Sequence, residues 1–320
     1  MRGLTSLPSI PLVTGPSPVE ELHRLRTALG GGPRLLVKRD DALPFAFGGN
    51  KVRKMQLVAA DALAGGADTL ITSGGIQSNH ARVTAAAAAK LGLSCVLVAN
   101  GAAQDQPTAN ALLDWLLGAQ VRHVADRTER APAVEAAAEE LRRAGRHPYV
   151  IPIGASTPLG AAAFVSAIEE LRQQLPRAPD VIVHSTSSGG TQAGLAAGCV
   201  LAAAGTRVVG ISADEGSAAL ERDIRQILDG VPALLGLPDG TFASAAVEVD
   251  DRFVGGGYGV PTPESVEAIE LLARTEALFL DPIYTAKAMA GLLARLRGGE
   301  FRDDETVLFW HTGGQVGLFA

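Results

Sequence analysis

Gly48-Gly49-Asn50-Lys51-Val52-Arg53-Lys54 is the stretch of this 320-residue chain that decides the fold. The segment before it, 35–41, predicts a strand that runs out into a loop, and an amphipathic helical pattern begins at Lys51. Lys51 is therefore expected at a loop-to-helix junction, where free backbone N–H groups and the helix dipole favour an anion. A lysine held there can be the amine nucleophile for an aldehyde cofactor, and the alternative is a solvated lysine at a helix start.

The composition predicts a globular α/β protein. A chain of 320 residues with 47% hydrophobic and 19% charged residues has two lobes or one large domain and is not disordered. The net charge of −6 comes from interspersed charges, which argues against a nucleic-acid or membrane surface. Residues 1–20 contain four prolines and no continuous apolar core, so they do not form a signal peptide. We expect a reduced, cytoplasmic protein.

The cysteines and histidines do not indicate a metal site. Cys95 lies in a strand-like run and Cys199 in an alanine-rich helical run, so both are expected to be small buried hydrophobes. The six histidines lack the spacing of metal ligands. Two long uncharged stretches, 148–168 and 181–206, change period internally and indicate strand–loop–helix units, not membrane spans.

Strands and helices alternate along most of the chain. Strands are predicted at 68–72, 94–99, 121–125, 149–153, 181–183, 207–211 and 306–311, and helices at 78–91, 108–117, 131–144, 158–175 and 190–204. This alternation predicts parallel sheets covered by helices. Ligands in such folds bind beyond the carboxyl ends of the strands, which directs attention to the loops there.

The loop 73–80 follows one strand and enters a helix through Gln77, Ser78, Asn79 and His80. These side chains can cap the helix. They can equally form a neutral cradle for a substrate carboxylate beside the free amides of the helix. The sequence around this loop leaves both interpretations open.

The loop 185–194 concentrates hydroxyl groups and glycines at a second helix start. That arrangement is typical of a phosphate cup, and a flexible glycine loop is the alternative. It lacks the lysine spacing of a nucleotide P-loop, and the chain lacks a dinucleotide fingerprint after its first strand. The ligand that remains for this loop is a cofactor with a single phosphate group.

Three further turns carry polar side chains. Tyr258 lies in the glycine-rich turn 255–261 and Tyr284 in the turn 281–287, where a phenol can pack, donate a hydrogen bond or act as an acid. Thr312 precedes two glycines at a strand end, which allows a flat ring to approach closely, although an ordinary turn explains the same residues.

Together these segments resemble the fold-type II pyridoxal-phosphate enzymes, and specifically the family of D-cysteine desulfhydrase and 1-aminocyclopropane-1-carboxylate deaminase. The resemblance runs from 38–41 to 311–314, with 48–54 and 77–80 as its most specific motifs. It implies a two-lobed, three-layer α/β/α fold with parallel-rich sheets, similar to the tryptophan synthase β subunit. The large, cofactor-binding lobe would comprise 1–53 and 164–320, and the small lobe 54–163.

The resemblance also implies roles for individual residues. Lys51 would bind pyridoxal 5′-phosphate covalently, Asn79 would contact the phenolic oxygen of the ring, and Thr312 would face the pyridine nitrogen. The phosphate would be held by Ser188, Gly189, Gly190 and Thr191. The substrate carboxylate would be bound by Ser78, Asn79 and His80, with Tyr258 and Tyr284 flanking the substrate. The catalytic set is Lys51, Ser78, Tyr258 and Tyr284.

The same resemblance favours D-cysteine as the substrate. Deaminases of the cyclopropane substrate carry glutamate where Thr285 stands, tend to be apolar where Thr312 stands, and have glutamine where His80 stands. We therefore expect α,β-elimination that yields pyruvate, sulfide and ammonia, with Thr285 near the substrate. The alternatives are deamination of the cyclopropane acid, elimination from L-cysteate or another β-substituted amino acid, and a non-catalytic cofactor or amino-acid binder. A homodimer is expected from the family.

Overall fold

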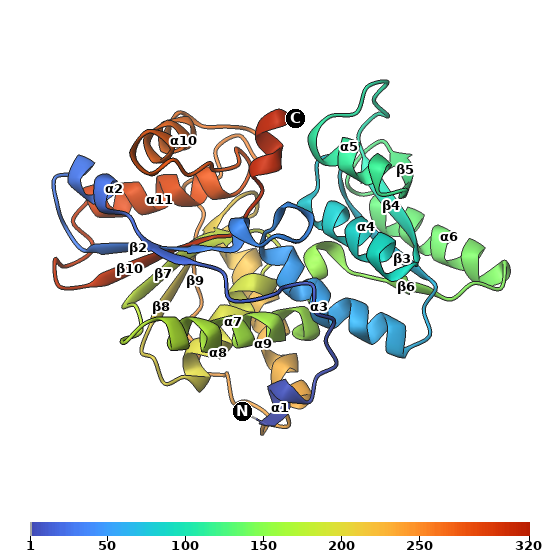
Figure 1. Ribbon diagram of the computed structural model, residues 1–320, viewed down its shortest axis with the longest axis horizontal. Coiled ribbons are helices and arrows are strands. Elements are labelled where there is room, and N and C mark those ends of the chain that lie inside the picture. The colour runs from blue at the N-terminus through green and yellow to red at the C-terminus, as the bar shows by residue number, and fades with distance from the viewer. Residues whose placement is uncertain (1) are drawn as a thin grey trace.

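The computed structural model describes residues 2–320, which form two α/β lobes, each built on its own sheet (Figure 1). The large lobe has a six-stranded sheet in the order β1-β2-β10-β7-β8-β9. Its strands are β1 (Val19–Glu21), β2 (Arg34–Arg39), β7 (Val181–Thr186), β8 (Arg207–Ser212), β9 (Glu248–Asp250) and β10 (Thr306–His311). All neighbouring pairs are parallel except β1 with β2.

The small lobe has a four-stranded parallel sheet in the order β5-β4-β3-β6. Its strands are β3 (Thr69–Gly75), β4 (Ser94–Asn100), β5 (Gln120–Val124) and β6 (Pro148–Val150). Thr69 is in register with Ser94 on one side and with Pro148 on the other. The strands expected from the sequence are all present, with bounds that differ by a few residues.

Helices cover both sheets. They are α1 (Arg2–Thr5), α2 (His23–Ala28), α3 (Asn50–Ala64), α4 (Asn79–Leu91), α5 (Ala109–Leu116), α6 (Arg130–Arg143), α7 (Pro158–Gln174), α8 (Gly190–Leu201), α9 (Ser217–Leu235), α10 (Pro263–Glu276) and α11 (Thr285–Arg297). Short 3-10 turns occupy η1 (Asp40–Ala42), η2 (Phe45–Phe47), η3 (Ile153–Ala155) and η4 (Gln315–Phe319). The helix expected to begin at Lys51 and the predicted helices from 78 to 204 are confirmed, whereas α1, α2, α9, α10 and α11 were not predicted.

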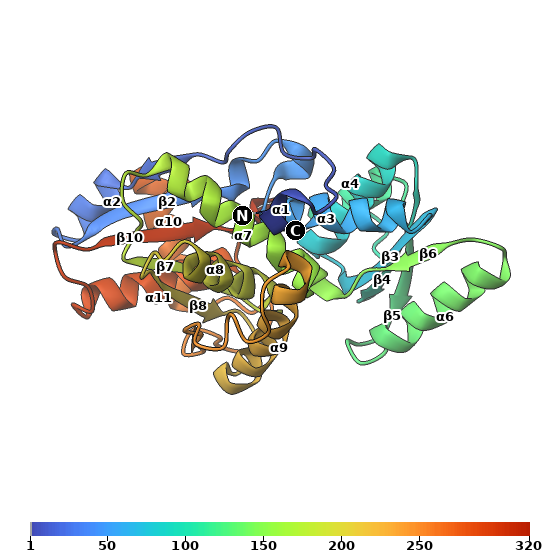
Figure 2. The same cartoon turned by 90° about the horizontal axis from the view of Figure 1, so that it is seen from below.

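The large lobe has three layers because its strand side chains alternate between two cores. Val183 and Phe309 pack with the residues of α11 on one face. Ile182 and Trp310 pack on the other face against α7 and α8. Figure 1 shows the sheet between these helices, with α11 above it and α7 and α8 below, and Figure 2 shows the same layers from below. Strands β7 and β10 are buried on both faces, which explains why their sequences are nearly continuously apolar.

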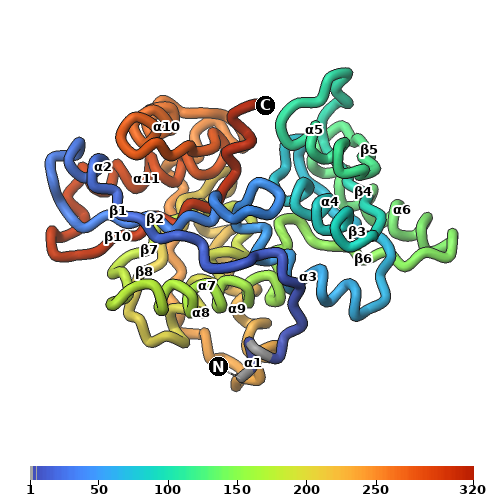
Figure 3. The backbone as a smooth tube through the Cα atoms, viewed as in Figure 1, coloured from blue at the N-terminus to red at the C-terminus, as the bar shows by residue number. Residues whose placement is uncertain are grey.

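Helices α3 and α7 connect the two lobes, as the backbone trace shows (Figure 3). A buried ion network holds the start of α3 on the large lobe. Arg53 donates to Asp40 at 2.9 Å and to Glu170 of α7 at 2.9 Å, and Trp310 donates to Asp40 at 2.8 Å. The expected lobe boundaries at 53/54 and 163/164 fall inside these two helices, and the division itself stays a prediction.

Candidate active site

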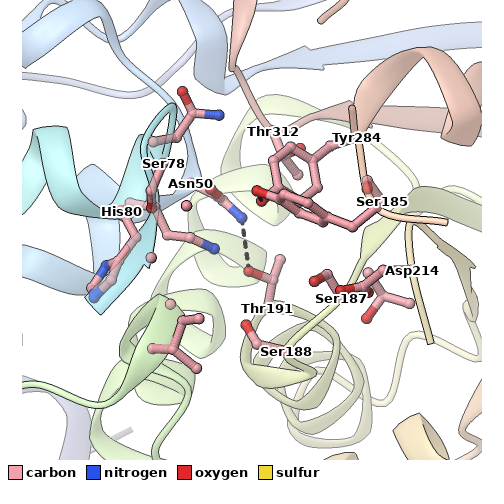
Figure 4. Close-up of a pocket in the computed structure, with 18 of the residues that line it drawn as sticks. Asn50, Ser78, His80, Ser185, Ser187, Ser188, Thr191, Asp214, Tyr284 and Thr312 are labelled. Carbon is pink, nitrogen blue, oxygen red and sulfur yellow. Dashed lines mark hydrogen bonds between the residues drawn. The ribbon is translucent and has the colours of Figure 1, made fainter. Parts of the chain in front are cut away.

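A cavity between the lobes lies at the carboxyl ends of β3, β7, β8 and β10. Its walls bring together most residues that the sequence singled out: Lys51, Ser78, Asn79, His80, Ser188, Gly189, Thr191, Tyr258, Tyr284 and Thr312. Several of them point toward the cavity centre in Figure 4. The expected residues Gly190 and Thr285 do not line it.

Lys51 occupies the first turn of α3. Two glycines before it adopt positive φ, 68° at Gly48 and 102° at Gly49, and the amide of Asn50 donates to the carbonyl of Thr312 at 2.9 Å. This contact joins the start of α3 to the end of β10. Enclosure by the protein lowers the pKa of Lys51 to about 8, because burial disfavours the charged amine. A useful fraction of this amine is therefore neutral and nucleophilic near neutral pH.

Asn79 is held in one orientation. Its Oδ1 atom accepts from Arg82 at 2.9 Å and from Asn110 at 2.9 Å. Both acceptor directions of the amide oxygen are thus used inside the protein, and the Nδ2 group remains a donor on the cavity wall. A donor is what the expected contact with a phenolic oxygen requires.

Ser78 and His80 have structural roles as well. The Ser78 hydroxyl caps α4 by accepting from the amide of Ala81 at 3.2 Å. The His80 Nε2 atom lies 2.9 Å from the Thr72 hydroxyl, which itself donates to the Ile151 carbonyl, so Nε2 carries the proton.

Burial, and then the nearby charges of Lys51 and Lys54, lower the pKa of His80 well below its ordinary value. A neutral ring whose proton is already used cannot donate to a substrate carboxylate. The first N–H groups of α4 and the Ser78 hydroxyl are better donors for that purpose.

The loop before α8 forms a cup lined by hydroxyl groups. Gly189 has φ 76°, a conformation that glycine adopts without strain. A Cβ on Gly190 would lie 2.8 Å from the Lys54 amine and 2.8 Å from the Ser156 hydroxyl, so the absence of a side chain keeps this space open. The hydroxyls of Ser185 and Thr186 are buried without a partner among residues 2–320.

Lys54 was not identified as a site residue from the sequence. Its side chain is fully buried, and among the described residues its amine makes one hydrogen bond, to the Gly154 carbonyl at 3.0 Å. Burial and then the charge of Lys51 lower the pKa of Lys54 well below its ordinary value. A buried amine with so few partners, next to the cup, suits a phosphate dianion. Its position one helical turn after Lys51 was the available signal.

The two tyrosines form a pair on the opposite wall. Their hydroxyls are 2.6 Å apart and their rings meet edge to face at 71°. Burial raises the pKa of both phenols above the ordinary value, so they are neutral near pH 7. The pair can therefore hold or pass a proton next to the substrate.

Thr285 is turned away from the cavity. It is fully buried, and its hydroxyl donates to Asp281 at 2.6 Å and accepts from the Asp281 amide at 2.8 Å. Asp281 also accepts from the amide of Tyr284 at 2.9 Å. The expected direct contact of Thr285 with substrate therefore lacks support from the geometry, and the residue positions the Tyr284 turn instead.

Three charged residues on the cavity wall were missed: Arg127, Arg130 and Asp214. Arg127 of the small lobe pairs with Glu215 of the large lobe at 2.9 Å. Burial raises the pKa of Asp214, and one of its carboxylate oxygens is buried without a partner among the described residues. These residues lie in segments without a motif, so the sequence offered no signal.

The chain is similar to known proteins over nearly its whole length. The family model for "pyridoxal-phosphate dependent enzyme" matches residues 10–313, and the chain belongs to that family. It is 39% identical over 333 aligned positions to the D-cysteine desulfhydrase of Klebsiella pneumoniae (strain 342), covering 100% of this chain and 98% of the relative. The expected family resemblance is confirmed.

Solved structures confirm the fold. A structure described as an ACC deaminase homologue superposes with a TM-score of 0.92 at 36% identity, covering 99% of this chain and 95% of the other. The processed form of threonine deaminase isoform 2 from Solanum lycopersicum superposes with a TM-score of 0.70 at 19% identity, covering 98% and 83%, and supports the fold alone. The expected fold-type II architecture is therefore correct.

The residues present fit pyridoxal phosphate. Lys51 offers a partly neutral amine, the cup before α8 offers unpartnered hydroxyls and a buried lysine, and Asn79 offers an oriented donor. When bound, the cofactor supplies an electron sink for a carbanion at the substrate Cα. Among the described residues, no group of His, Cys, Asp and Glu could hold a metal ion, and no helix is long and apolar enough to cross a membrane.

Proposed function

We propose that this protein is a pyridoxal-phosphate-dependent lyase that eliminates the β-substituent of a small D-amino acid, with D-cysteine as the first candidate. The products are pyruvate, sulfide and ammonia. The observation that carries the proposal is that one cavity is lined both by Lys51, whose pKa is lowered, and by a pair of neutral tyrosines. The full-length similarity to a D-cysteine desulfhydrase supports the choice of substrate.

Each catalytic residue has a proposed task. Lys51 binds the cofactor and, when displaced, takes the proton from the substrate Cα. Ser78 and the first amides of α4 bind the carboxylate. Tyr258 and Tyr284 flank the substrate, and Thr312 offers only a neutral hydroxyl to the pyridine nitrogen. A neutral partner leaves the ring a weaker electron sink, which suffices when the β-substituent is a good leaving group.

The cofactor phosphate is assigned to the cup before α8. Ser188 and Thr191 contribute hydroxyls, and Gly189 and Gly190 contribute backbone. We add Lys54 to this set, because its buried amine lies beside the open space at Gly190. Asn79 donates to the phenolic oxygen, while Arg82 and Asn110 fix its orientation.

A second candidate is deamination of 1-aminocyclopropane-1-carboxylate. The solved ACC deaminase homologue, at 36% identity, favours it. Thr312 lines the cavity at a position where the cyclopropane deaminases tend to be apolar, which argues against this candidate. Thr285 does not decide the question, because its hydroxyl is bonded to Asp281 and does not line the cavity. Release of 2-oxobutanoate from the cyclopropane acid would favour this candidate.

A panel of D- and L-amino acids tests the proposal. The purified holoenzyme is incubated with D-cysteine, L-cysteine, L-cysteate and the cyclopropane acid, and keto acid, ammonia and sulfide or sulfite are measured. We expect stoichiometric pyruvate, sulfide and ammonia from D-cysteine, and none with Lys51→Ala. Turnover of another amino acid without turnover of D-cysteine would overturn the substrate assignment. Spectral response to amino acids without any product would identify a binder.

We further propose a cytoplasmic homodimer. Cys95 and Cys199 are buried free thiols, as in a reduced compartment. Exposed apolar side chains gather on α5, η2 and η4: Phe47, Leu112, Trp115, Leu116, Leu318 and Phe319. Helix α5 packs against η4, and Gln315 of η4 donates to the Phe47 carbonyl at 3.3 Å, so these side chains belong to one surface, termed the apolar patch.

A further inference from the structure

Arg130 is a cavity residue to which the proposed reaction assigns no role. It begins helix α6 of the small lobe and lines the same cavity as Lys51. Arg127, Asp214, Tyr258 and Tyr284 line this cavity as well. The side chain of Arg130 therefore shares the cavity with the tyrosine pair.

The guanidinium of Arg130 is nearly unused by the protein. Its Nε group donates to the Arg127 carbonyl at 3.2 Å. Within residues 2–320, its two terminal amino groups form no hydrogen bond and no ion pair. Arg127 differs, since Glu215 lies 2.9 Å away and Asp214 lies 3.9 Å away. Of the two arginines on this wall, Arg130 is the one available to an external anion.

The position of Arg130 is also unfavourable for the fold. A cation in the first turn of a helix is repelled by the helix dipole. The acidic residue next to Arg130, the N-cap Glu129, has its carboxylate bonded to the Ala125 amide at 2.9 Å. The neighbouring Arg127 adds like-charge repulsion. A bound anion would relieve both effects, so this arginine is better explained by a ligand than by stability.

The other anionic groups expected in the cavity have partners elsewhere. The cofactor phosphate has the cup before α8 with Lys54, and the substrate carboxylate has the start of α4. This inference rests on the proposed function, in which the β-substituent is the remaining group of the substrate without a binding partner. The wall formed by Arg130 and the tyrosines is the part of the cavity left to bind it. We propose that Arg130 is a specificity-determining residue that binds the β-substituent of the substrate and holds it as an anion when it leaves.

The proposal defines a substrate class: small amino acids whose β-substituent is anionic or leaves as an anion, such as a thiolate or a sulfonate. In the step itself, the Cα proton passes to Lys51 and its electron pair forms the Cα=Cβ bond. The Cβ–S bond breaks, and its electron pair stays on sulfur, giving hydrosulfide from cysteine or sulfite from cysteate. Arg130 donates hydrogen bonds and no proton, because a guanidinium stays protonated.

A substitution with a matched control tests this role. Arg130→Gln is compared with Arg143→Gln, which removes the same charge from the exposed end of the same helix. The holoenzymes are assayed with 3-chloroalanine and with cysteate, each as both enantiomers. The β-substituent of 3-chloroalanine is uncharged in the substrate and leaves as chloride, a weak hydrogen-bond acceptor, whereas the sulfonate of cysteate is anionic throughout. Loss of a charge-assisted hydrogen bond predicts that Arg130→Gln lowers kcat/KM for cysteate about 10- to 100-fold more than for 3-chloroalanine. Equal losses for the two substrates, or a similar pattern in Arg143→Gln, would overturn the proposal.

A binding measurement separates this inference from the proposed reaction. Calorimetry of the holoenzyme with 3-sulfopropanoate and with butanoate compares an anionic and an apolar end without any turnover. We expect tighter binding of 3-sulfopropanoate by the wild type and loss of that preference in Arg130→Gln. If the preference is present but no substrate is turned over, the lyase proposal fails and the role of Arg130 stands. If the wild type shows no preference, the role of Arg130 fails.

Discussion

Burial makes the amine of Lys51 more nucleophilic than that of an ordinary lysine, because it lowers the pKa. With a pKa of about 8, its neutral fraction at pH 7 is roughly a few hundred times that of an ordinary lysine with a pKa near 10.5. Since the neutral amine reacts with an aldehyde, we expect cofactor uptake by the apoenzyme to accelerate with rising pH and to level off above about pH 8. Stopped-flow absorbance of pyridoxal phosphate binding measures this rate. Acceleration that continues to pH 10, or a visible cofactor band that survives in Lys51→Ala, would contradict the assignment.

Lys54 leads to a prediction about affinity. Lys54→Met keeps the buried volume but removes the cation, so the holoenzyme loses a charge-assisted contact to phosphate. We expect the dissociation constant of pyridoxal phosphate to rise about 10- to 100-fold. The apoprotein should be no less stable, because the lost charge was buried with a single partner.

Equilibrium dialysis measures the affinity of Lys54→Met, and thermal unfolding of the apoprotein measures its stability. Lys90→Met, on the exposed last turn of α4, is the matched control and should leave both unchanged. Unaltered affinity in Lys54→Met would place the phosphate elsewhere.

At the scale of elements, the close contact between the end of β10 and the start of α3 is decisive. A Cβ on Gly313 would lie 2.5 Å from the Cα of Gly49, and Gly313 has φ 87°. Gly313→Ala therefore combines backbone strain with a clash between two backbones, and we expect a loss of about 2–4 kcal/mol in unfolding free energy. Gly299 has a φ of 68° and open space where a Cβ would lie. Gly299→Ala should therefore lose only the free energy of placing alanine at positive φ, about 1 kcal/mol.

Urea unfolding of the apoproteins compares these two alanine variants. If Gly313→Ala and Gly299→Ala lose the same unfolding free energy, the backbones of β10 and α3 can move apart without cost. A larger loss in Gly313→Ala, together with weaker cofactor binding, would support its role in placing Lys51.

The elements that the sequence could and could not reveal differ in a physical way. Strands β3, β4, β7 and β10 are short apolar runs between turn residues, and a local pattern suffices to find them. Helix α9 was missed. It contains Gly230 and Pro232, which weaken a helical pattern, yet Gly230 is needed because a side chain there would collide with Pro158. That reason cannot be seen in a local pattern, because Gly230 and Pro158 are 72 positions apart in the sequence (230 − 158).

The same distinction holds for the site in the whole molecule. Motifs at strand ends pointed to Lys51 and to the proposed phosphate cup, because glycines and hydroxyls cluster locally there. Lys54 and Thr285 depend on contacts that the sequence analysis did not foresee: the amine of Lys54 meets Gly154, which lies 100 positions away, and the hydroxyl of Thr285 turns back to Asp281. Arg130 lines the cavity only because segments of both lobes form its walls. Residue types can suggest chemistry, but the folded chain decides which wall each side chain occupies.

The assembly of whole molecules gives the last prediction. The apolar patch includes Phe319, Trp115 and Leu116 with 75%, 66% and 63% of their surface exposed, far more than side chains of this kind usually leave in water. We expect the patch to be buried between two copies of the chain, and Phe319→Asp with Trp115→Asp to convert a dimer into monomers in light scattering after size exclusion. Leu63→Asp, exposed on α3 outside the patch, should leave the dimer intact. A wild type that is monomeric at micromolar concentration, or a double variant that stays dimeric, would contradict this interface. Because neither Trp115 nor Phe319 lines the cavity, the monomer should retain cofactor binding, which distinguishes lost assembly from lost folding.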